Sequence, residues 1–179
     1  KVSKIIITGN IPTDKNGAPL IISASKSPKG KDLLRLWIYQ ILSAIYNGTD
    51  TQGQIVNITK ELVETNLRAP ESPMRHLEFL LKIYLKNLVE PQPNFPETCY
   101  AMAKLARKID MDDDTYSFAQ QQHGRKEWSK SYDGKNGEGH DENIATFFSI
   151  DDLNHPTFLE IFSTIWLPLA ASILPAAKN

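Results

Sequence analysis

Apolar and polar residues follow short patterns at the start of the chain, and these patterns predict strands. Residues 2–11 are rich in isoleucine and valine, which favour an extended strand. The Asn16-Gly17 pair is a strong hairpin-turn signal, and residues 18–25 supply a second apolar run after it. We therefore expect a β-hairpin at the start of the fold, with a further short strand over residues 54–59.

Longer patterns with helical spacing dominate the rest of the chain. They predict helices over residues 31–46, 73–88, 96–108, 113–131 and 158–169. The first is apolar nearly all round, which is typical of a buried helix, and Asn47-Gly48 should end it. The second begins at Ser72-Pro73 and has the clearest apolar face in the chain. Pro168 should kink or end the last helix, and the glycine-rich residues 132–143 predict a loop.

Strands first and mostly helices afterwards predict the α/β (α+β) fold class, with a small mixed sheet covered by helices. The chain has 179 residues, 41% of them apolar and 23% charged, a globular balance that predicts one domain over residues 1–179. No apolar run reaches the ~18 residues that a membrane span needs. A single cysteine, Cys99, excludes an internal disulfide and favours a cytoplasmic protein. Because the chain starts at Lys1 inside a strand-like run, we expect a piece of a longer protein.

The net charge of −1 conceals two oppositely charged regions. Residues 1–38 carry a balance of +5, and residues 136–160 carry a balance of −6 with no lysine or arginine. The basic region is suited to a polyanion and the acidic region to a basic partner. Two solvated faces with no partner would have the same charges, and this alternative stays open.

Several residues are candidates for chemistry, and each has a plainer explanation. The acidic run Asp110, Asp112, Asp113 and Asp114 has the carboxylates that a hard cation prefers, but helix capping explains it better. The residues His76, His123, His140 and His155 have no ligand spacing, so we expect surface side chains. Cys99 lacks an activating neighbour in sequence and should be a buried, inert thiol.

A basic and aromatic run covers residues 125–130 (RKEWSK), a mixture found on nucleic-acid-binding surfaces. A helix with a polar face and one buried tryptophan has the same pattern, and that interpretation is favoured. The sequence contains no phosphate-binding loop, dinucleotide fingerprint, nucleophile elbow or zinc-protease motif.

The predicted hairpin and the helix after it resemble the core of PD-(D/E)xK nucleases. In that family two carboxylates hold magnesium, which activates water, and a lysine orients the attacking water. Pro12 stands at the position of the first acid and Ala24 at that of the second, while Lys26 stands at that of the lysine. The resemblance therefore implies a nuclease-like core with no catalytic residues and no metal.

Further blocks resemble the RecC family, the gamma subunit of bacterial exodeoxyribonuclease V. They are residues 30–37 (GKDLLRLW), 77–84 (LEFLLKIY), 91–97 (PQPNFPE) and 125–128 (RKEW), followed by Phe147-Phe148. The blocks keep the order they have in that family across nearly the whole chain. Residues 142–144 depart from the pattern of the family's acidic loop.

The resemblance implies a non-catalytic domain in a DNA-repair complex. Its partners would be RecB and RecD, with duplex and single-stranded DNA, while ATP and magnesium act in other subunits and no cofactor is needed here. Lys26, Lys29, Lys31 and Arg35 are our candidates for contacts with DNA phosphates. Leu169, Ile173 and Leu174 belong to an apolar tail and are our candidates for a partner interface. The alternative is an active magnesium nuclease with a relocated acid, taken from Asp14 or residues 110–114.

Overall fold

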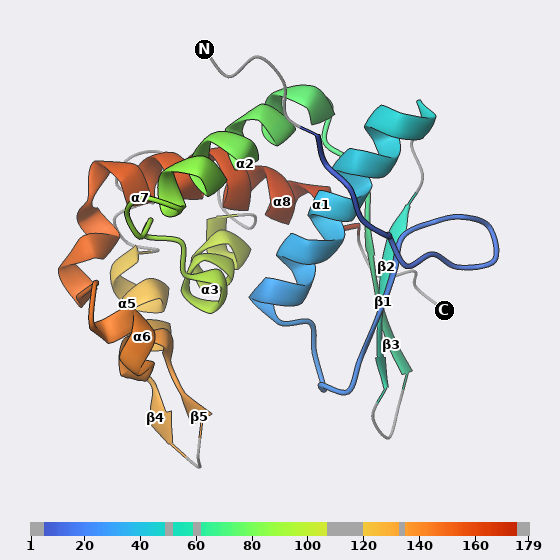
Figure 1. Cartoon of the computed structure of the whole chain (residues 1–179). Helices are drawn as coiled ribbons and strands as arrows, with labels where there is room; N and C mark the ends of the chain where they lie inside the picture. The colour runs from blue at the N-terminus through green and yellow to red at the C-terminus, as the bar shows by residue number, and fades with distance from the viewer. Residues whose placement is uncertain (1–5, 49–51, 59–61, 107–119, 133–134, 175–179) are drawn as a thin grey trace.

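A computed structural model describes residues 6–48, 52–58, 62–106, 120–132 and 135–174 (Figure 1). Along the chain the elements are β1 (Leu20–Ser23), α1 (Gly30–Asn47), β2 (Gly53–Ile58), β3 (Leu62–Leu67), α2 (Pro73–Asn87), α3 (Pro96–Ala106), η1 (Gln120–Gly124), α5 (Arg125–Trp128), β4 (Ser131–Tyr132), β5 (Lys135–Asn136), η2 (Glu138–His140), α6 (Glu142–Ala145), η3 (Ile150–Asn154), α7 (Pro156–Ile161), η4 (Phe162–Trp166) and α8 (Leu167–Ser172). No described helix is both long and apolar enough to cross a membrane.

A three-stranded mixed sheet forms one side of the molecule, as the fold class predicted. Strand β2 lies in the middle, parallel to β1 and antiparallel to β3. The prediction of a strand over residues 2–11 is wrong for its described part, since residues 6–11 form no strand. The turn after them does form, with an isolated bridge between Thr13 and Pro19. Strand β3 had no prediction, and the first strand of the expected hairpin is replaced by β2 as the partner of β1.

Helix α1 packs on one face of this sheet, and eight of its residues are buried (Figure 1). Leu33, Leu36, Trp37 and Ile41 have no exposed surface, which confirms the prediction of a buried helix. The helix ends at Gly48, whose φ of 63° is the left-handed conformation that glycine adopts readily. The buried amide of Gln40 donates to the carbonyl oxygen of Leu67 at 3.1 Å, which ties α1 to β3.

The aromatic core lies between α1, α3 and the C-terminal helices. Phe158, Phe162 and Trp166 have no exposed surface, and Phe158 stacks on Phe95 with ring centroids 5.8 Å apart. The last helix does not end at Pro168 but passes through the π-helical turn η4 into α8. Since proline lacks an N–H donor, a shift in the hydrogen-bond pattern just before it accommodates this residue within the helix.

Helix α2 begins at Pro73 as predicted, although the side chain of Ser72 makes no capping hydrogen bond. Its apolar face is covered much less than that of α1, because Ile83 alone among its residues is buried. Tyr84 and Leu85 are exposed, at 60% and 39%. They lie along an open apolar groove of about 940 Å³ that also includes Leu34, Ile38, Phe147 and Phe148.

The described part of residues 132–143, expected to be a loop, has definite structure. Strands β4 and β5 form a short antiparallel pair, and the 3-10 turn η2 follows directly. A Cβ atom on Gly137 would overlap the carbonyl oxygen of Glu127, and one on Gly139 would overlap the ring of Trp128. The glycines therefore permit close packing over Trp128, which is 5% exposed.

Candidate nucleic-acid interface

The junction between β1 and α1 brings together four polar side chains, which come from β1, the β1–α1 connection, α1 and β2. The Ser23 hydroxyl donates to the Asp32 carboxylate at 3.3 Å, and the Asn57 amide donates to the Ser25 hydroxyl at 3.0 Å. Asp32 is 8% exposed and Asn57 is fully buried. This cluster lies where the nuclease resemblance places its active centre, at the end of β1. Its one carboxylate is already held by a neighbouring hydroxyl.

The two positions that carry metal-binding acids in the nuclease family carry no carboxylate in this chain. Pro12 and Ala24 are exposed, and neither side chain can bind a cation. Asp14 accepts hydrogen bonds from the N–H groups of Asn16 at 2.8 Å and Ala18 at 2.9 Å. These bonds, led by the one from Ala18, hold the pKa of Asp14 below its usual value. Asp14 therefore closes the turn before β1 (a local role).

Four cations form a basic strip along the β1–α1 connection and the first turns of α1. Its members are Lys26, Lys29, Lys31 and Arg35. All four side chains are exposed, and the described residues include no acidic partner within ion-pair distance of any of them. The strip can contact a polyanion without breaking an existing ion pair.

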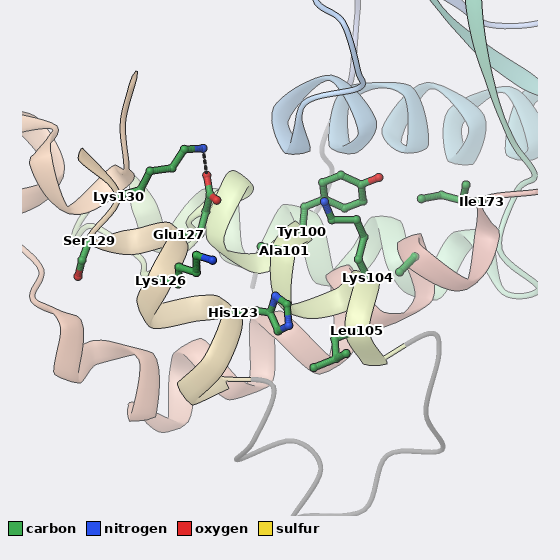
Figure 2. A pocket seen from close by; sticks show the side chains of 11 residues that line it. Tyr100, Ala101, Lys104, Leu105, His123, Lys126, Glu127, Ser129, Lys130 and Ile173 are labelled. Atoms are coloured by element: carbon green, nitrogen blue, oxygen red, sulfur yellow. Dashed lines mark hydrogen bonds and ion pairs between the residues drawn. The ribbon is translucent and has the colours of Figure 1, made fainter. Parts of the chain in front are cut away.

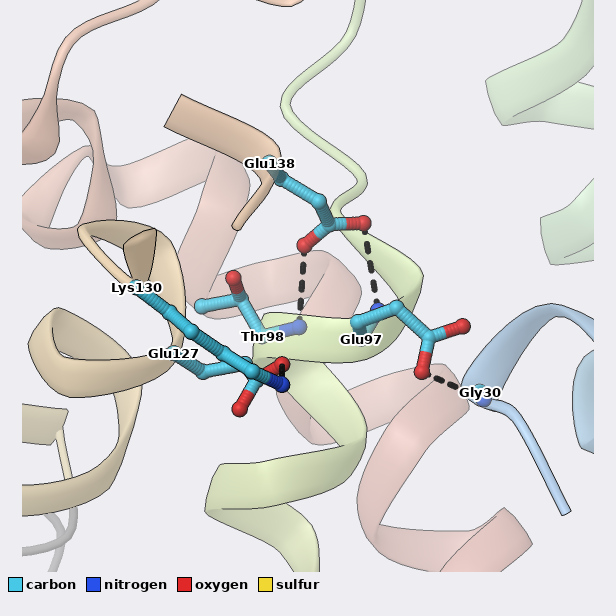
Figure 3. Close-up of polar contacts among 6 residues, drawn as sticks. All are labelled: Gly30, Glu97, Thr98, Glu127, Lys130 and Glu138. Carbon is cyan, nitrogen blue, oxygen red and sulfur yellow. Dashed lines mark hydrogen bonds and ion pairs between the residues drawn. The ribbon is translucent and has the colours of Figure 1, made fainter. Parts of the chain in front are cut away.

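The backbone at the start of α1 is occupied by a carboxylate from another helix (Figure 3). Glu97, at the start of α3, accepts the N–H groups of Gly30 at 3.0 Å and Lys31 at 3.4 Å. Glu138 in turn accepts the N–H groups of Glu97 at 3.1 Å and Thr98 at 2.9 Å. Two glutamates thus cap two helices in series. Any phosphate at this surface would have to bind the side chains of the basic strip instead of the helix N-terminus.

Burial and hydrogen bonding act in opposite directions on Glu138. Desolvation raises the pKa of Glu138, and the hydrogen bonds from the backbone of Thr98 and Glu97 oppose that rise without cancelling it. Glu138 belongs to the acidic region that the sequence assigned to a basic partner. Its carboxylate instead serves the chain's own helix α3.

A second basic site is a cavity of about 1030 Å³ between α3, α5 and the end of α8 (Figure 2). Its polar lining includes Tyr100, Lys104, His123 and Lys126, and an ion pair of 2.9 Å joins Lys130 to Glu127 at its edge. The ammonium group of Lys104 lies 4.6 Å from the centre of the Tyr100 ring. The apolar residues of the lining are Ala101, Leu105, Ala170 and Ile173.

Comparison with protein families gives a match to the model of the RecC C-terminal domain over residues 7–107, more than half of the chain. The chain belongs to the RecC C-terminal domain family. A comparison with curated proteins finds no match. The RecC-matched segment runs from the turn before β1 to the end of α3 and includes the whole basic strip.

The tail proposed as a partner interface in this RecC-family chain is largely used within the chain itself. Leu169 has no exposed surface, so it belongs to the core and is removed from the candidate interface. Ile173 forms an isolated antiparallel bridge with Leu67. The N–H of Leu174 donates to the carbonyl oxygen of Asn66 at 2.9 Å. Ile173 and Leu174 are half-buried against the edge of β3, where they pair with its backbone groups.

The remaining sequence candidates have mixed outcomes. Cys99 is fully buried, as predicted, and burial raises its pKa well above the usual value, which favours the protonated thiol. The prediction that His76 is a surface residue is correct only in part, because the side chain is half-buried and its ring packs edge-on against Trp37 with centroids 5.0 Å apart. Burial lowers the pKa of His76, although a hydrogen bond with the Thr164 backbone opposes this. Residues 110–114 lie outside the described residues.

Sequence reasoning missed both glutamate caps and the second basic site. Tyr100 and Lys104 stand four residues apart on α3, and that spacing alone places them on one helix face. Lys126 was noted in the run of residues 125–130, whose favoured interpretation is confirmed for the buried Trp128. No local pattern links Lys126 to Lys104, because the fold brings their helices together.

Proposed function

We propose that this chain is a non-catalytic, nuclease-like domain of a RecC subunit in the exodeoxyribonuclease V complex. It serves subunit assembly and DNA strand handling in double-strand-break repair by recombination. The family match over residues 7–107 supports membership in that subunit. Its partners are RecB, RecD and DNA, and the complex works in the cytoplasm. ATP and magnesium act in the other subunits, and this chain contributes no cofactor site.

The observation that carries the non-catalytic role is the set of side chains at the end of β1. Two-metal and one-metal nucleases need carboxylates that converge on the cation. Pro12 and Ala24 occupy the acid positions, and the nearby Asp32 is buried with a bond from Ser23. Nor do the described residues bring three histidine, cysteine, aspartate or glutamate side chains together in a metal-binding group.

The basic strip supports contact with DNA instead of chemistry on DNA. Exposed lysines and arginines bind the phosphates of any sequence, and such contacts position a duplex without reading its bases. The strip lies beside the β1–α1 junction, on the segment that matches the RecC family. Lys26, at the lysine position of the nuclease resemblance, is here one of four phosphate contacts.

An assay of DNA degradation tests the absence of catalysis. The purified chain is mixed with end-labelled linear duplex DNA and magnesium, beside the variants Lys26→Ala and Asp14→Ala. We expect no magnesium-dependent degradation by any of the three proteins. Degradation that survives Lys26→Ala but is lost in Asp14→Ala would instead establish the alternative, an active nuclease with a relocated acid.

Co-elution with RecB and RecD from the same source tests the assembly role. We expect a complex with at least one of them on size-exclusion chromatography at physiological salt. An unrelated protein of similar size and charge serves as the control for non-specific association. Failure to co-elute with either subunit would contradict an assembly role for this part of RecC.

A further inference from the structure

We propose that the cavity between α3, α5 and α8 binds single-stranded DNA, with phosphates between Lys104 and Lys126 and a base against the apolar side chains of the lining. The cavity lies on different elements from the basic strip, which belongs to the β1–α1 connection and to α1. The inference rests on the proposed function for the class of ligand, and it assigns that ligand to a site of its own.

The charge of the cavity favours an anion. Among the described residues, its lining holds Lys104, Lys126 and Lys130 against one carboxylate, that of Glu127. The 2.9 Å ion pair between Lys130 and Glu127 accounts for one charge of each sign. Lys104 and Lys126 are exposed, and within the described part of the chain neither lies within ion-pair distance of an acidic group. Two positive charges thus face the same space, and phosphate groups would balance them.

The rest of the lining favours an anion that carries a flat apolar group. Ala101, Leu105 and Ile173 contribute apolar side chains to the lining, which we call the apolar floor, and a bare phosphate or sulfate ion would not use them. Tyr100 stands beside this floor with Lys104 across its ring at 4.6 Å. Phosphates and bases alternate along a single strand of DNA, and grooves that bind such strands combine cations with aromatic and apolar surface.

The geometry distinguishes a single strand from a duplex. The cavity is a recess of about 1030 Å³, which suits one or two nucleotides more than the side of a double helix. In a duplex the bases are stacked inside and present only their edges in the grooves. In Figure 2 His123 and Lys126 lie on one side of the lining and Tyr100 and Lys104 on the other, with the Lys104 side chain extended toward the Tyr100 ring.

Binding of a labelled fifteen-nucleotide oligothymidine tests the site by fluorescence anisotropy across a series of salt concentrations. The test variant is Lys104→Gln with Lys126→Gln, and the matched control is Lys15→Gln with Lys86→Gln, two exposed lysines elsewhere. Removing two phosphate contacts should reduce the slope of log K against log salt by about 1.4. We expect the test variant to bind at least about tenfold more weakly, and the control to bind within about twofold of the unchanged chain.

Crosslinking locates the bound strand independently of affinity. An oligonucleotide with 5-iododeoxyuridine is irradiated with the unchanged chain, and the attached peptide is identified by mass spectrometry. We expect attachment to the peptide that contains Tyr100. Circular dichroism of the test variant should match that of the unchanged chain, since both lysines are exposed.

Three outcomes would overturn the inference. Equal weakening in the test and control variants would mean general attraction to positive charge, and crosslinks confined to other peptides would place the strand elsewhere. Displacement of the oligonucleotide by equimolar thymidine monophosphate would mean a mononucleotide pocket. Absence of binding by the unchanged chain would end this inference, whereas co-elution with RecB or RecD would still support the proposed function.

Discussion

Helices α1 and α2 carry the two strongest helical patterns in the sequence, yet the fold encloses only the first. Eight residues of α1 are buried, against one of α2. Helix α1 lies between the sheet and the helices α2, α3 and α8, whereas α2 packs mainly on α1 and η4 (Figure 1). The comparison teaches that apolar periodicity predicts which face of a helix is apolar. The neighbouring elements determine how much of that face is buried.

The largest expected difference between the two helices is in the free energy of unfolding after one aromatic side chain on each is truncated. Trp37→Ala should lower the free energy of unfolding by about 3–5 kcal/mol, because it empties a fully buried site. Tyr84→Ala, at a side chain that is 60% exposed, should change it by less than about 0.5 kcal/mol. Urea denaturation followed by circular dichroism measures both. Similar losses in the two variants would show that α2 is as well covered as α1.

A smaller effect should come from the carboxylate that caps α1. Glu97→Ala removes the acceptor for the N–H groups of Gly30 and Lys31 and should cost about 1–2 kcal/mol. Glu78→Ala on α2 is the matched control, since Glu78 is exposed and caps no helix in the described structure. The same urea titration applies. Equal stability of the two variants would mean that solvent caps α1 as well as Glu97 does.

The smallest expected effect is a pH dependence of the free energy of unfolding that is caused by Glu138. Its pKa is raised in the folded state, so the folded chain holds this proton more tightly than the unfolded chain. The stability from this proton is fully present below the unfolded value of 4.5 and is lost as pH rises through the higher folded pKa.

The variant Glu138→Gln isolates this contribution. It keeps an acceptor oxygen but has no titrating proton, so its stability should fall less than that of the unchanged chain as pH rises above 4.5. Urea midpoints measured at several pH values test this. Parallel curves for the two proteins would show that Glu138 titrates alike in the folded and unfolded states.

The sequence predicted those parts of the fold that local chemistry determines. Helix α1, its end at Gly48, strand β2 and the start of α2 at Pro73 all depend on residues within one or two turns. Residues 6–11, the described part of the first predicted strand, form no strand because no described strand pairs with them. Strand β3 was missed because polar residues interrupt its alternation.

The candidate site divides in the same way. Exposure of the basic strip follows from the polar character of lysine and arginine. The bond from the Gly30 N–H to Glu97 spans 67 positions and that from the Glu97 N–H to Glu138 spans 41, so no window along the sequence contains either pair. The cavity of Lys104 and Lys126 likewise depends on how α3 and α5 meet, which only tertiary packing determines.

The series of glutamate caps has a consequence for how this chain folds during translation. A ribosome releases residues 7–107 first, but the carboxylate that caps α3 arrives only with Glu138. The ring of Phe95 acquires its stacking partner later still, when Phe158 has been synthesised. The nascent chain therefore holds its RecC-like segment incomplete while the remainder is translated. Residues that are synthesised late therefore complete the packing of a core whose other side is synthesised early.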